Sequence, residues 1–391
     1  MSGKAVPEQP QENSLDLPAR PAFDLDFAYV ENFLEQAIGN QAIPGAVAVW
    51  GNLTEEPHLI AVGRQGISRN RRPVHPNLIY DLASVTKIIS TTSLTMILAG
   101  RGQLDISEPL FDGPLAAVLP SSFDRRITPL HLLTHQSGLL AWHPFYSLAP
   151  AQNRRGRLEA ICAVMPQCQT VAPGQETVYS DLNFILLGFL LEETTSQRQD
   201  ELFRQEIAEK LGLTRTGYRP RLKDVAPTED GFRQGGPVGH PQAAIKGPTP
   251  LGRPHDDNAA FLEGIAGHAG LFGTAEEIWL VVREWHHGLS GAGGLFNKAT
   301  LEEFIRPRPT IKDEGRPLGF NSRRLVESMK GTHIPAEALG HLGYTGPSVW
   351  WDTQSGTAMV LLTNRVHPKV ANPAWKAGYY QGLGLRPGPG S

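Results

Sequence analysis

Ser84-Val85-Thr86-Lys87 is the stretch of this 391-residue chain that decides its fold. A hydroxyl and an amine three residues apart lie on one face of a helix, about one turn from each other. Serine is a weak nucleophile at its ordinary pKa, and an amine in an apolar setting can lose its charge and accept the hydroxyl proton. The start of such a helix also offers backbone N–H groups where an oxyanion would form. The spacing predicts nucleophilic catalysis by Ser84, with Lys87 beside it.

The segments on either side of this tetrapeptide separate two interpretations of it. Alone, a Ser-x-x-Lys arises by chance about once in a chain of this length, and Ser84 is then only the cap of a solvated helix. Residues 78–83 are mostly apolar, however, and residues 88–98 carry almost no charge. We therefore expect a helix that is buried nearly all round, where a lysine needs a specific reason to lie.

Composition limits the classes of function. The chain is long enough for two lobes or one large domain, and its 40% hydrophobic and 19% charged residues are ordinary for a soluble protein. A net charge of −3 gives no case for binding nucleic acid or an anionic membrane surface. We see no Cys/His cluster with metal-ligand spacing, and we expect no metal, no cofactor and no membrane span. Cys162 and Cys168 are expected to be reduced thiols.

The two ends of the chain have the composition of loose segments. Residues 1–22 are polar, rich in Pro, Gln and Glu, and without the apolar core of a signal peptide. We expect a disordered leader there, a loose tail at 385–391, and a cytoplasmic protein.

Strands near both ends and helices between them indicate an α+β fold. The expected strands are residues 45–50, 58–62, 317–321, 339–344, 348–352 and 357–362. The expected helices are residues 27–38, 128–134, 155–165, 181–194, 199–211 and 373–383. We expect one antiparallel sheet, flanked by helices, in a domain of residues 23–82 and 276–384. A mostly helical domain of residues 83–275 would be inserted into it, with an active site between the two.

Two further stretches carry chemistry. Tyr179 stands on a loop just before a helix, where a phenol next to a lysine ammonium can have a depressed pKa and act as a base. It can also be a half-buried loop aromatic. In residues 340–346, Gly343 and Gly346 let another group approach the backbone, and an edge strand there can supply an N–H to an oxyanion. The alternative is a glycine-rich turn with a surface histidine.

The order Ser-x-x-Lys, Tyr-x-Asp and His-x-Gly resembles the penicillin-recognising serine hydrolases, in particular their class C β-lactamase-like branch. Leu-Leu-Thr-His-Gln-Ser-Gly-Leu at 132–139 is similar to a segment of that branch. The stretches at 226–229, 255–259, 264–272 and 364–368 look like the subgroup of muropeptide amidases and penicillin-binding-protein-like peptidases. The resemblance implies a β-lactamase/transpeptidase-like fold and hydrolysis through an acyl-enzyme.

The resemblance also implies roles for single residues. Ser84 would attack the carbonyl, and Lys87 and Tyr179 would share the proton transfers, with the choice of base left open. The backbone N–H groups of Ser84 and Tyr344 would form the oxyanion hole. The residues expected to bind substrate or support the site are Asp181, His341, Gly343, His255, His268 and Arg365. For His255 and His268, capping of loops is the structural alternative.

Two positions depart from the β-lactamase pattern. Asp181 stands where those enzymes have Asn, and its charge should hold Lys87 protonated more strongly. His341 stands where they have Lys, which removes a permanent cation for a substrate carboxylate. Arg365 can restore part of that binding. Both changes favour a peptidase, amidase or esterase over an efficient β-lactamase.

These observations lead to three alternatives for function. The first is a serine hydrolase that cleaves an amide in cell-wall muropeptides, of the muramyl-L-alanine amidase or D-Ala-D-Ala carboxypeptidase type. The second is a broad carboxylesterase with weak or no β-lactamase activity. The third is a catalytically silent binding protein, against which the intact Ser84, Lys87 and Tyr179 argue. The expected partner is a muropeptide or another small molecule, and the oligomeric state stays open.

Overall fold

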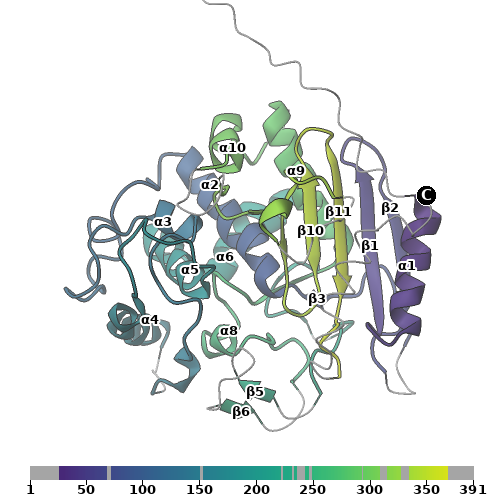
Figure 1. The fold of residues 1–391 in the computed structure, drawn as a ribbon, viewed down its shortest axis with the longest axis horizontal. Coiled ribbons are helices and arrows are strands. Elements are labelled where there is room, and N and C mark those ends of the chain that lie inside the picture. Colours follow the sequence, from purple (N-terminus) through teal and green to yellow (C-terminus); the bar gives the residue numbers. More distant parts are fainter. Residues whose placement is uncertain are drawn as a thin grey trace, which may run out of the picture.

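The computed structural model describes most of the chain (Figure 1). The described residues are 26–67, 72–149, 153–221, 223–230, 249–292, 294–308, 315–326 and 334–368, with the backbone of 233–235 and 243–245. The expected helix at 373–383, leader at 1–22 and tail at 385–391 lie outside these ranges. Among the described residues, none of the helices combines the length and hydrophobicity that a membrane span requires.

A six-stranded antiparallel sheet joins the two ends of the chain (Figure 1). Its strands, in spatial order, are β2 (His58–Gly63), β1 (Gly45–Asn52), β11 (Thr357–Thr363), β10 (Ser348–Asp352), β9 (Leu339–Leu342) and β8 (Asn321–Ser322). The N-terminal strand β1 pairs along its length with the C-terminal strand β11, from Ala46 opposite Thr363 to Asn52 opposite Thr357. The prediction of one sheet built from both chain ends is therefore confirmed.

One predicted strand is wrong. Residues 317–321 form a strand only at Asn321, where the two-residue β8 begins. The Leu318 N–H donates to the Phe304 carbonyl at 2.8 Å, and the Gly319 N–H donates to the Leu133 carbonyl at 3.0 Å. These backbone N–H groups donate to carbonyls of helix residues, so they do not pair with a neighbouring strand.

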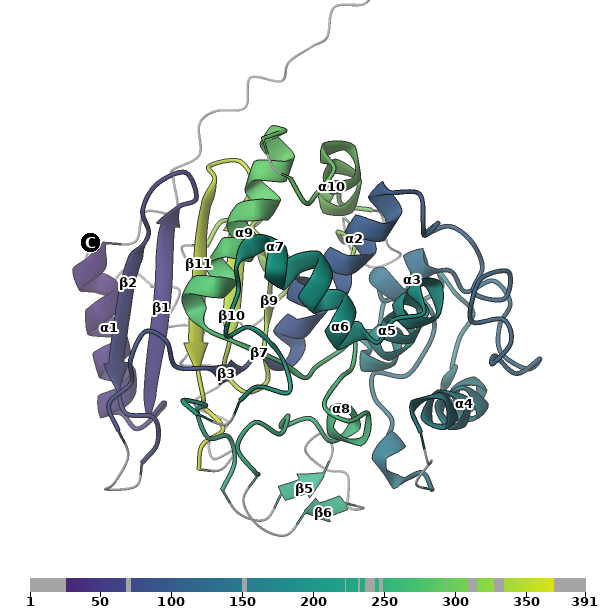
Figure 2. The same cartoon turned by 180° about the vertical axis from the view of Figure 1, so that it is seen from behind.

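Helices cover both faces of this sheet (Figure 2). Helix α1 (Phe27–Gly39) packs on β1 and β2 through an apolar stripe that includes Val30 and Leu34. Helix α9 (Ala275–Ser290) packs on β1 and β11, and it was not predicted. Its sequence nevertheless has the start and stop signals of a helix, since the Thr274 side chain accepts from the Glu277 N–H and Gly291 ends it with φ +81°.

The predicted helices of the middle segment are present. They are α3 (Pro129–Leu133), α4 (Arg154–Val164), α5 (Asp181–Thr195), and α6 (Gln199–Phe203) continued by a π-helical turn into α7 (Glu209–Leu211). The structure adds α8 (Asp257–Phe261) and α10 (Lys298–Ile305). It also adds a small sheet of β3 (Tyr80–Asp81), β7 (Leu271–Gly273) and β4 (Gly217–Tyr218), and the pair β5 (Arg233–Gly235) and β6 (Ala243–Ile245). Strands this short leave little periodicity in the sequence.

The segment that carries Ser84 and Lys87 is a buried helix in three parts. A 3-10 turn at Ala83–Val85 is followed by a π-helical turn at Lys87–Thr92 and by α2 (Ser93–Gly100). Every residue from 85 to 98 is buried, which confirms the predicted burial. Several of its hydroxyls donate within the protein, for example Thr91 Oγ1 to the Gly267 carbonyl at 2.6 Å, whereas the buried Thr92 Oγ1 has no hydrogen-bond partner among the described residues.

Candidate active site

The Lys87 ammonium is fully buried and lies at the centre of a cluster of polar atoms. Its Nζ donates to Ser84 Oγ at 3.1 Å, to Asp181 Oδ1 at 2.7 Å and to the His268 carbonyl at 3.0 Å. These acceptors come from the start of the buried helix, the first residue of α5 and the loop before β7. All three hydrogens of the ammonium are thus used, and the amine is fixed in place.

Opposing effects set the charge of Lys87. Burial lowers its pKa, but the Asp181 carboxylate and Tyr179 raise it by more, so that the pKa lies above its ordinary value. Lys87 is therefore an ammonium in the free protein. The expectation that Asp181 holds the amine charged is confirmed. An amine in an apolar setting can lose its charge, but here the carboxylate lies within hydrogen-bond distance and Lys87 keeps its proton.

Tyr179 lies beside Lys87, with Nζ 5.2 Å from the centre of its ring. The residue is 37% exposed as a whole, yet burial of the phenol raises its pKa. The Lys87 charge and the Ser84 hydroxyl lower this pKa only in part. The expected depressed pKa is therefore wrong, because desolvation of the phenolate outweighs its attraction to the ammonium.

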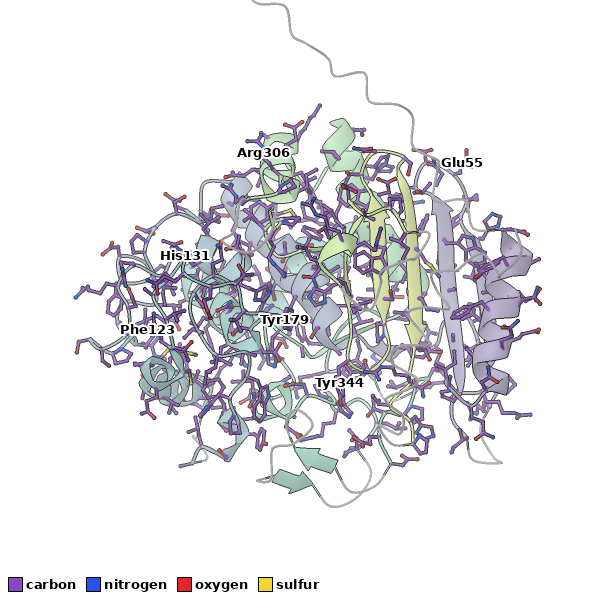
Figure 3. All side chains as sticks on the ribbon, in the orientation of Figure 1. Glu55, Phe123, His131, Tyr179, Arg306 and Tyr344 are labelled. Atoms are coloured by element: carbon purple, nitrogen blue, oxygen red, sulfur yellow. The ribbon has the colours of Figure 1, made fainter. Side chains whose placement is uncertain are left out.

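The turn after β9 is fastened to the backbone at the start of the buried helix. The Thr345 hydroxyl donates to the Asp81 carbonyl at 2.7 Å. A Cβ atom on Gly343 would lie 2.6 Å from the Leu82 carbonyl oxygen, so the close approach requires glycine. Tyr344 belongs to this turn and lies where the helical part of the molecule meets the sheet (Figure 3). Its backbone is thus held near the helix that carries the tetrapeptide.

Asp81 is a residue of this region that the sequence analysis did not assign. It is buried, and its Oδ1 accepts from the Ala83 N–H at 2.9 Å while its Oδ2 accepts from the His255 N–H at 2.7 Å. Burial raises its pKa against the effect of these N–H groups. Ala83 has φ +45°, a strained conformation directly before Ser84 that these contacts hold. A single acidic residue in the apolar stretch 78–83 was the available signal.

His341 lies on β9, with its ring centre 5.7 Å from that of Tyr179. Nδ1 lies 2.8 Å from the Leu342 carbonyl and therefore carries the proton that it donates, while the buried Nε2 has no hydrogen-bond partner among the described residues. Burial and the Lys87 charge lower its pKa to about 3. The imidazole is neutral near pH 7, in agreement with the expected loss of a permanent cation at this position.

His268 contributes its backbone to the site and its side chain to a separate pair. Its Nε2 lies 2.9 Å from Asp256 Oδ1, and the imidazole is buried. Burial raises the pKa of Asp256, but the His268 charge and hydrogen bond outweigh this and lower it. The pair fixes the loop whose carbonyl accepts from Lys87.

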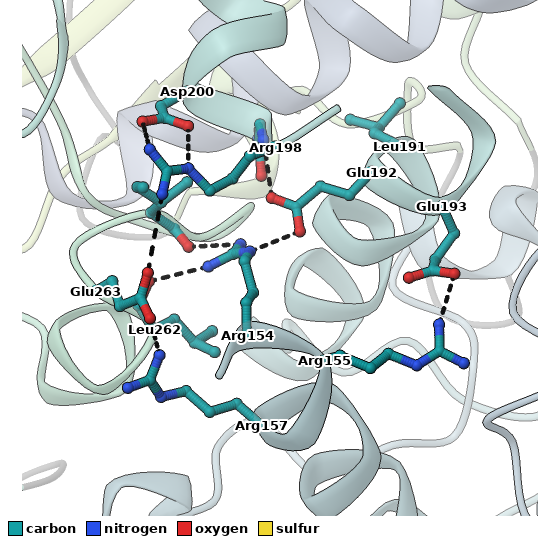
Figure 4. A network of polar contacts seen from close by, with 12 residues as sticks. Arg154, Arg155, Arg157, Leu191, Glu192, Glu193, Arg198, Asp200, Leu262 and Glu263 are labelled. Carbon is teal, nitrogen blue, oxygen red and sulfur yellow. Dashed lines mark hydrogen bonds and ion pairs between the residues drawn. The ribbon is translucent and has the colours of Figure 1, made fainter. Parts of the chain in front are cut away.

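A second anchor of the loop before β7 is a network of ion pairs around α4 (Figure 4). Arg154 donates to Glu192 Oε2 at 2.6 Å and to the carbonyls of Leu262 and Ile265 at 3.0 and 2.9 Å. A single guanidinium thus ties α4 and α5 to this loop. His268, whose carbonyl accepts from Lys87, lies three residues after Ile265 in this loop.

His255 and Arg365 lie around Tyr344 rather than around Lys87. The His255 ring centre is 5.5 Å from that of Tyr344, and its Nε2 is 2.9 Å from Glu229 Oε2. The Arg365 guanidinium lies 5.1 Å from the Tyr344 ring centre. Arg365 also lines a cavity of about 800 Å³ that is otherwise bounded mainly by residues 38–44 and 63–67. The expected site residues thus divide into a buried group at Lys87 and an outer group at Tyr344.

Comparisons with known proteins give the family of this chain. The Beta-lactamase family model matches residues 30–380. N-acetylmuramyl-L-alanine amidase of Bacillus subtilis (strain 168) is 30% identical over 386 residues, covering 90% of this chain and 84% of that protein. A protein of Escherichia coli (strain K12) named "Putative D-alanyl-D-alanine carboxypeptidase" is 30% identical over 318 residues, covering 75% of this chain and 71% of that protein.

Among solved structures, "EstCE1, a hydrolase with promiscuous acyltransferase activity" has a TM-score of 0.69 at 19% identity, covering 91% of this chain and 97% of that chain. That likeness concerns the fold and confirms the β-lactamase/transpeptidase-like architecture. The family match extends over most of the chain and includes every residue of the buried group at Lys87. The chain therefore belongs to the beta-lactamase family of serine hydrolases.

Proposed function

We propose that this protein hydrolyses the amide bond between the muramyl group and L-alanine in cell-wall muropeptides, through an acyl-enzyme on Ser84. The observation that carries the reaction type is the contact of Ser84 Oγ with the buried Nζ of Lys87 at 3.1 Å, with Asp181 behind it. The substrate class is supported by the 30% identity to the Bacillus subtilis amidase over 90% of the chain.

In the first step, Ser84 Oγ bonds to the carbonyl carbon while its proton passes to the pair formed by Lys87 and Tyr179. The C–N bond then breaks, and the pair returns the proton to the leaving amine. Water attacks the resulting ester, and the acid leaves as Ser84 regains its proton. Since Lys87 is an ammonium and Tyr179 a neutral phenol in the free protein, the pair has to lose one proton first. Their titrations are coupled, and we assign the base to the pair.

The oxyanion of the tetrahedral intermediate would accept from the backbone N–H groups of Ser84 and Tyr344. The Ser84 N–H belongs to the first turn of a helix, where backbone donors lack intrahelical acceptors. The donors on either side of it have other acceptors, since the Ala83 N–H donates to Asp81 and the Val85 N–H donates to Leu82. These contacts orient the turn without using the donor that the reaction needs.

The neutral His341 favours an amidase over a carboxypeptidase. A D-Ala-D-Ala carboxypeptidase substrate has a free carboxylate next to the scissile amide, whereas the muramyl-L-alanine amide has none at that distance. The resemblance places a lysine at this position in β-lactamases, but here the imidazole has a pKa of about 3 and carries no charge near pH 7. Without a lysine ammonium at this position, a substrate carboxylate next to the scissile amide has one attractive charge fewer to bind to.

The test is mass-spectrometric product analysis after incubation with a muramyl-tripeptide and, separately, with a stem peptide that ends in D-Ala-D-Ala. Ser84→Ala is the control for both. Free tripeptide and intact N-acetylmuramic acid from wild type alone would support the proposal. Release of the terminal D-alanine would replace the amidase by a carboxypeptidase. If neither product forms but small acyl esters are cleaved, the protein is a carboxylesterase. If no product forms, no ester is cleaved and a fluorophosphonate does not label Ser84, the silent binding protein is the alternative that remains.

A further inference from the structure

We propose that His135 is a positioning residue for Tyr179, which it holds near Lys87 through the backbone on either side of Tyr179 and through one face of its ring. His135 lies in the stretch 132–139, directly after α3, and the sequence analysis used that stretch only as a sign of the fold. The inference rests on the proposed function, because it assumes that Tyr179 takes part in proton transfer.

Three contacts from His135 surround Tyr179. The Val178 N–H, one residue before it, donates to the His135 carbonyl at 2.9 Å. The Ser180 N–H, one residue after it, donates to the His135 Nδ1 atom at 3.0 Å. The two rings themselves pack with centres 4.8 Å apart. The backbone on either side of the phenol and one side of its ring are thus all held by the same residue.

The hydrogen bonds to Nδ1 determine the protonation state of the His135 imidazole. Asn183 Nδ2 lies 3.3 Å from the same Nδ1 atom. The Asn183 Oδ1 atom in turn accepts from the Ser137 hydroxyl at 2.6 Å. Because the Ser180 N–H can only donate, Nδ1 carries no proton, and the neutral His135 is protonated on Nε2. Burial, together with the Arg316 and Lys87 charges, lowers its pKa well below the ordinary value.

The backbone of His135 gives an independent sign that the side chain is needed. Its φ is +58°, in the left-handed region that follows many helix ends. Glycine is the usual residue there, asparagine the next, and a histidine at positive φ is uncommon. Neither of the usual residues provides an aromatic ring that packs on Tyr179 and an Nδ1 that reaches the Ser180 N–H. The strain therefore has a reason in the contacts that the imidazole makes.

The segment that His135 holds has no regular structure of its own. Residues 176–180 form neither helix nor strand, and Tyr179 is 37% exposed. Besides His135, the segment is held by the Ser180 hydroxyl, which donates to the Leu140 carbonyl at 2.6 Å, and the ring packs on His341 at 5.7 Å. Loss of the His135 contacts removes the restraints on both sides of Tyr179 in the sequence, and the phenol can then shift relative to Lys87, which lies 5.2 Å from its ring centre. Loss of reactive geometry by even about 1 Å can slow catalysis about 100-fold.

Two substitutions separate positioning from folding. His135→Phe keeps an aromatic ring but removes the Nδ1 acceptor, whereas His135→Asn keeps an acceptor and tolerates positive φ. His286→Phe is the matched control, since His286 is a half-buried histidine on α9 whose ring contacts Trp351. The rate of Ser84 acylation by an activated ester is measured per titrated active site, together with its pH profile. The second measurement is the 13Cζ NMR resonance of Tyr179 in tyrosine-labelled protein, which needs no activity.

We expect His135→Phe to be acylated about 10- to 100-fold more slowly per active site. The pH dependence of its acylation rate should be displaced, and the 13Cζ resonance of Tyr179 should shift. His135→Asn should recover at least part of the rate, and His286→Phe should match wild type in both measurements. A Tyr179 resonance and pH limb unchanged in His135→Phe would overturn the proposal, as would equal effects of the Phe and Asn variants. If wild type itself is not acylated, the proposed function fails, and the NMR comparison still decides whether His135 positions Tyr179.

Discussion

Lys87 Nζ lies 2.7 Å from Asp181 Oδ1, and this ion pair joins residues 94 positions apart in a site where the lysine has no exposure to solvent. The carboxylate raises the pKa of Lys87 and also that of Tyr179, because it stabilises the ammonium and opposes the phenolate. An amide at position 181, as in the β-lactamase pattern, would do neither. The pair therefore determines at which pH the site can accept the Ser84 proton.

Asp181→Asn is expected to move the acid limb of the kcat/KM profile to lower pH, by about one unit. The direction is the same whether Lys87 or Tyr179 is the base, since the carboxylate raises both pKa values. The measurement is a pH–rate profile with an activated ester. Asp200→Asn, which alters a surface pair with Arg198, serves as the control. An unchanged limb, or one displaced to higher pH, would show that Asp181 does not set the charge state of the pair.

Gly343→Ala is expected to slow acylation about 100-fold while lowering the free energy of unfolding by about 1–3 kcal/mol. The new Cβ atom would lie 2.6 Å from the Leu82 carbonyl oxygen and push the Tyr344 turn away from the buried helix. Gly340→Ala on the same strand is the contrast. Its Cβ would lie 1.9 Å from the Val349 carbonyl oxygen, inside the pairing of β9 with β10, so stability should suffer more. A wild-type rate per active site in Gly343→Ala would disprove the role of this close approach.

His341→Gln is expected to make the protein less sensitive to acid. The pKa of His341 is about 3 in the folded protein, against the ordinary 6.5. Between these values only the unfolded chain binds the proton, so stability falls as the pH falls through 6.5 towards 3. From pH 7 to 4.5 this group costs about 2–3 kcal/mol of unfolding free energy, which the glutamine variant does not lose. Urea unfolding at both pH values tests this, with His75→Gln as control. Equal losses in wild type and His341→Gln would contradict it.

His341→Lys is expected to change specificity. A permanent cation on β9 should raise kcat/KM for a stem peptide with a terminal D-Ala carboxylate, relative to the same peptide with an amidated end. We expect the ratio to rise about tenfold, which corresponds to about 1.4 kcal/mol of free energy. The paired assays check this, and thermal unfolding verifies that the variant folds. A ratio equal to that of wild type would mean that position 341 does not face the substrate carboxylate.

The elements that could be predicted are those whose signals lie close together in the chain. Residues 27–38 form α1 because apolar residues such as Val30 and Leu34 recur at helical spacing. Helix α9 has comparable signals at Thr274 and Gly291, although the sequence analysis does not predict it. The strand predicted at 317–321 failed for a different reason. Its backbone groups bond to Phe304 and Leu133, which local periodicity does not reveal.

In the site, too, local signals were predictable and contacts between distant residues were not. Spacing along the chain was enough to predict that Ser84 and Lys87 lie together, because residues three apart in a helix lie on the same face in any surroundings. Spacing could not predict the protonation state of Lys87, because the pKa of Lys87 depends on Asp181, a residue 94 positions away. For Tyr179 the predicted direction was wrong, because burial raises its pKa more than the ammonium lowers it. Desolvation and charge act through space, so the protonation states were decided by packing between distant parts of the chain.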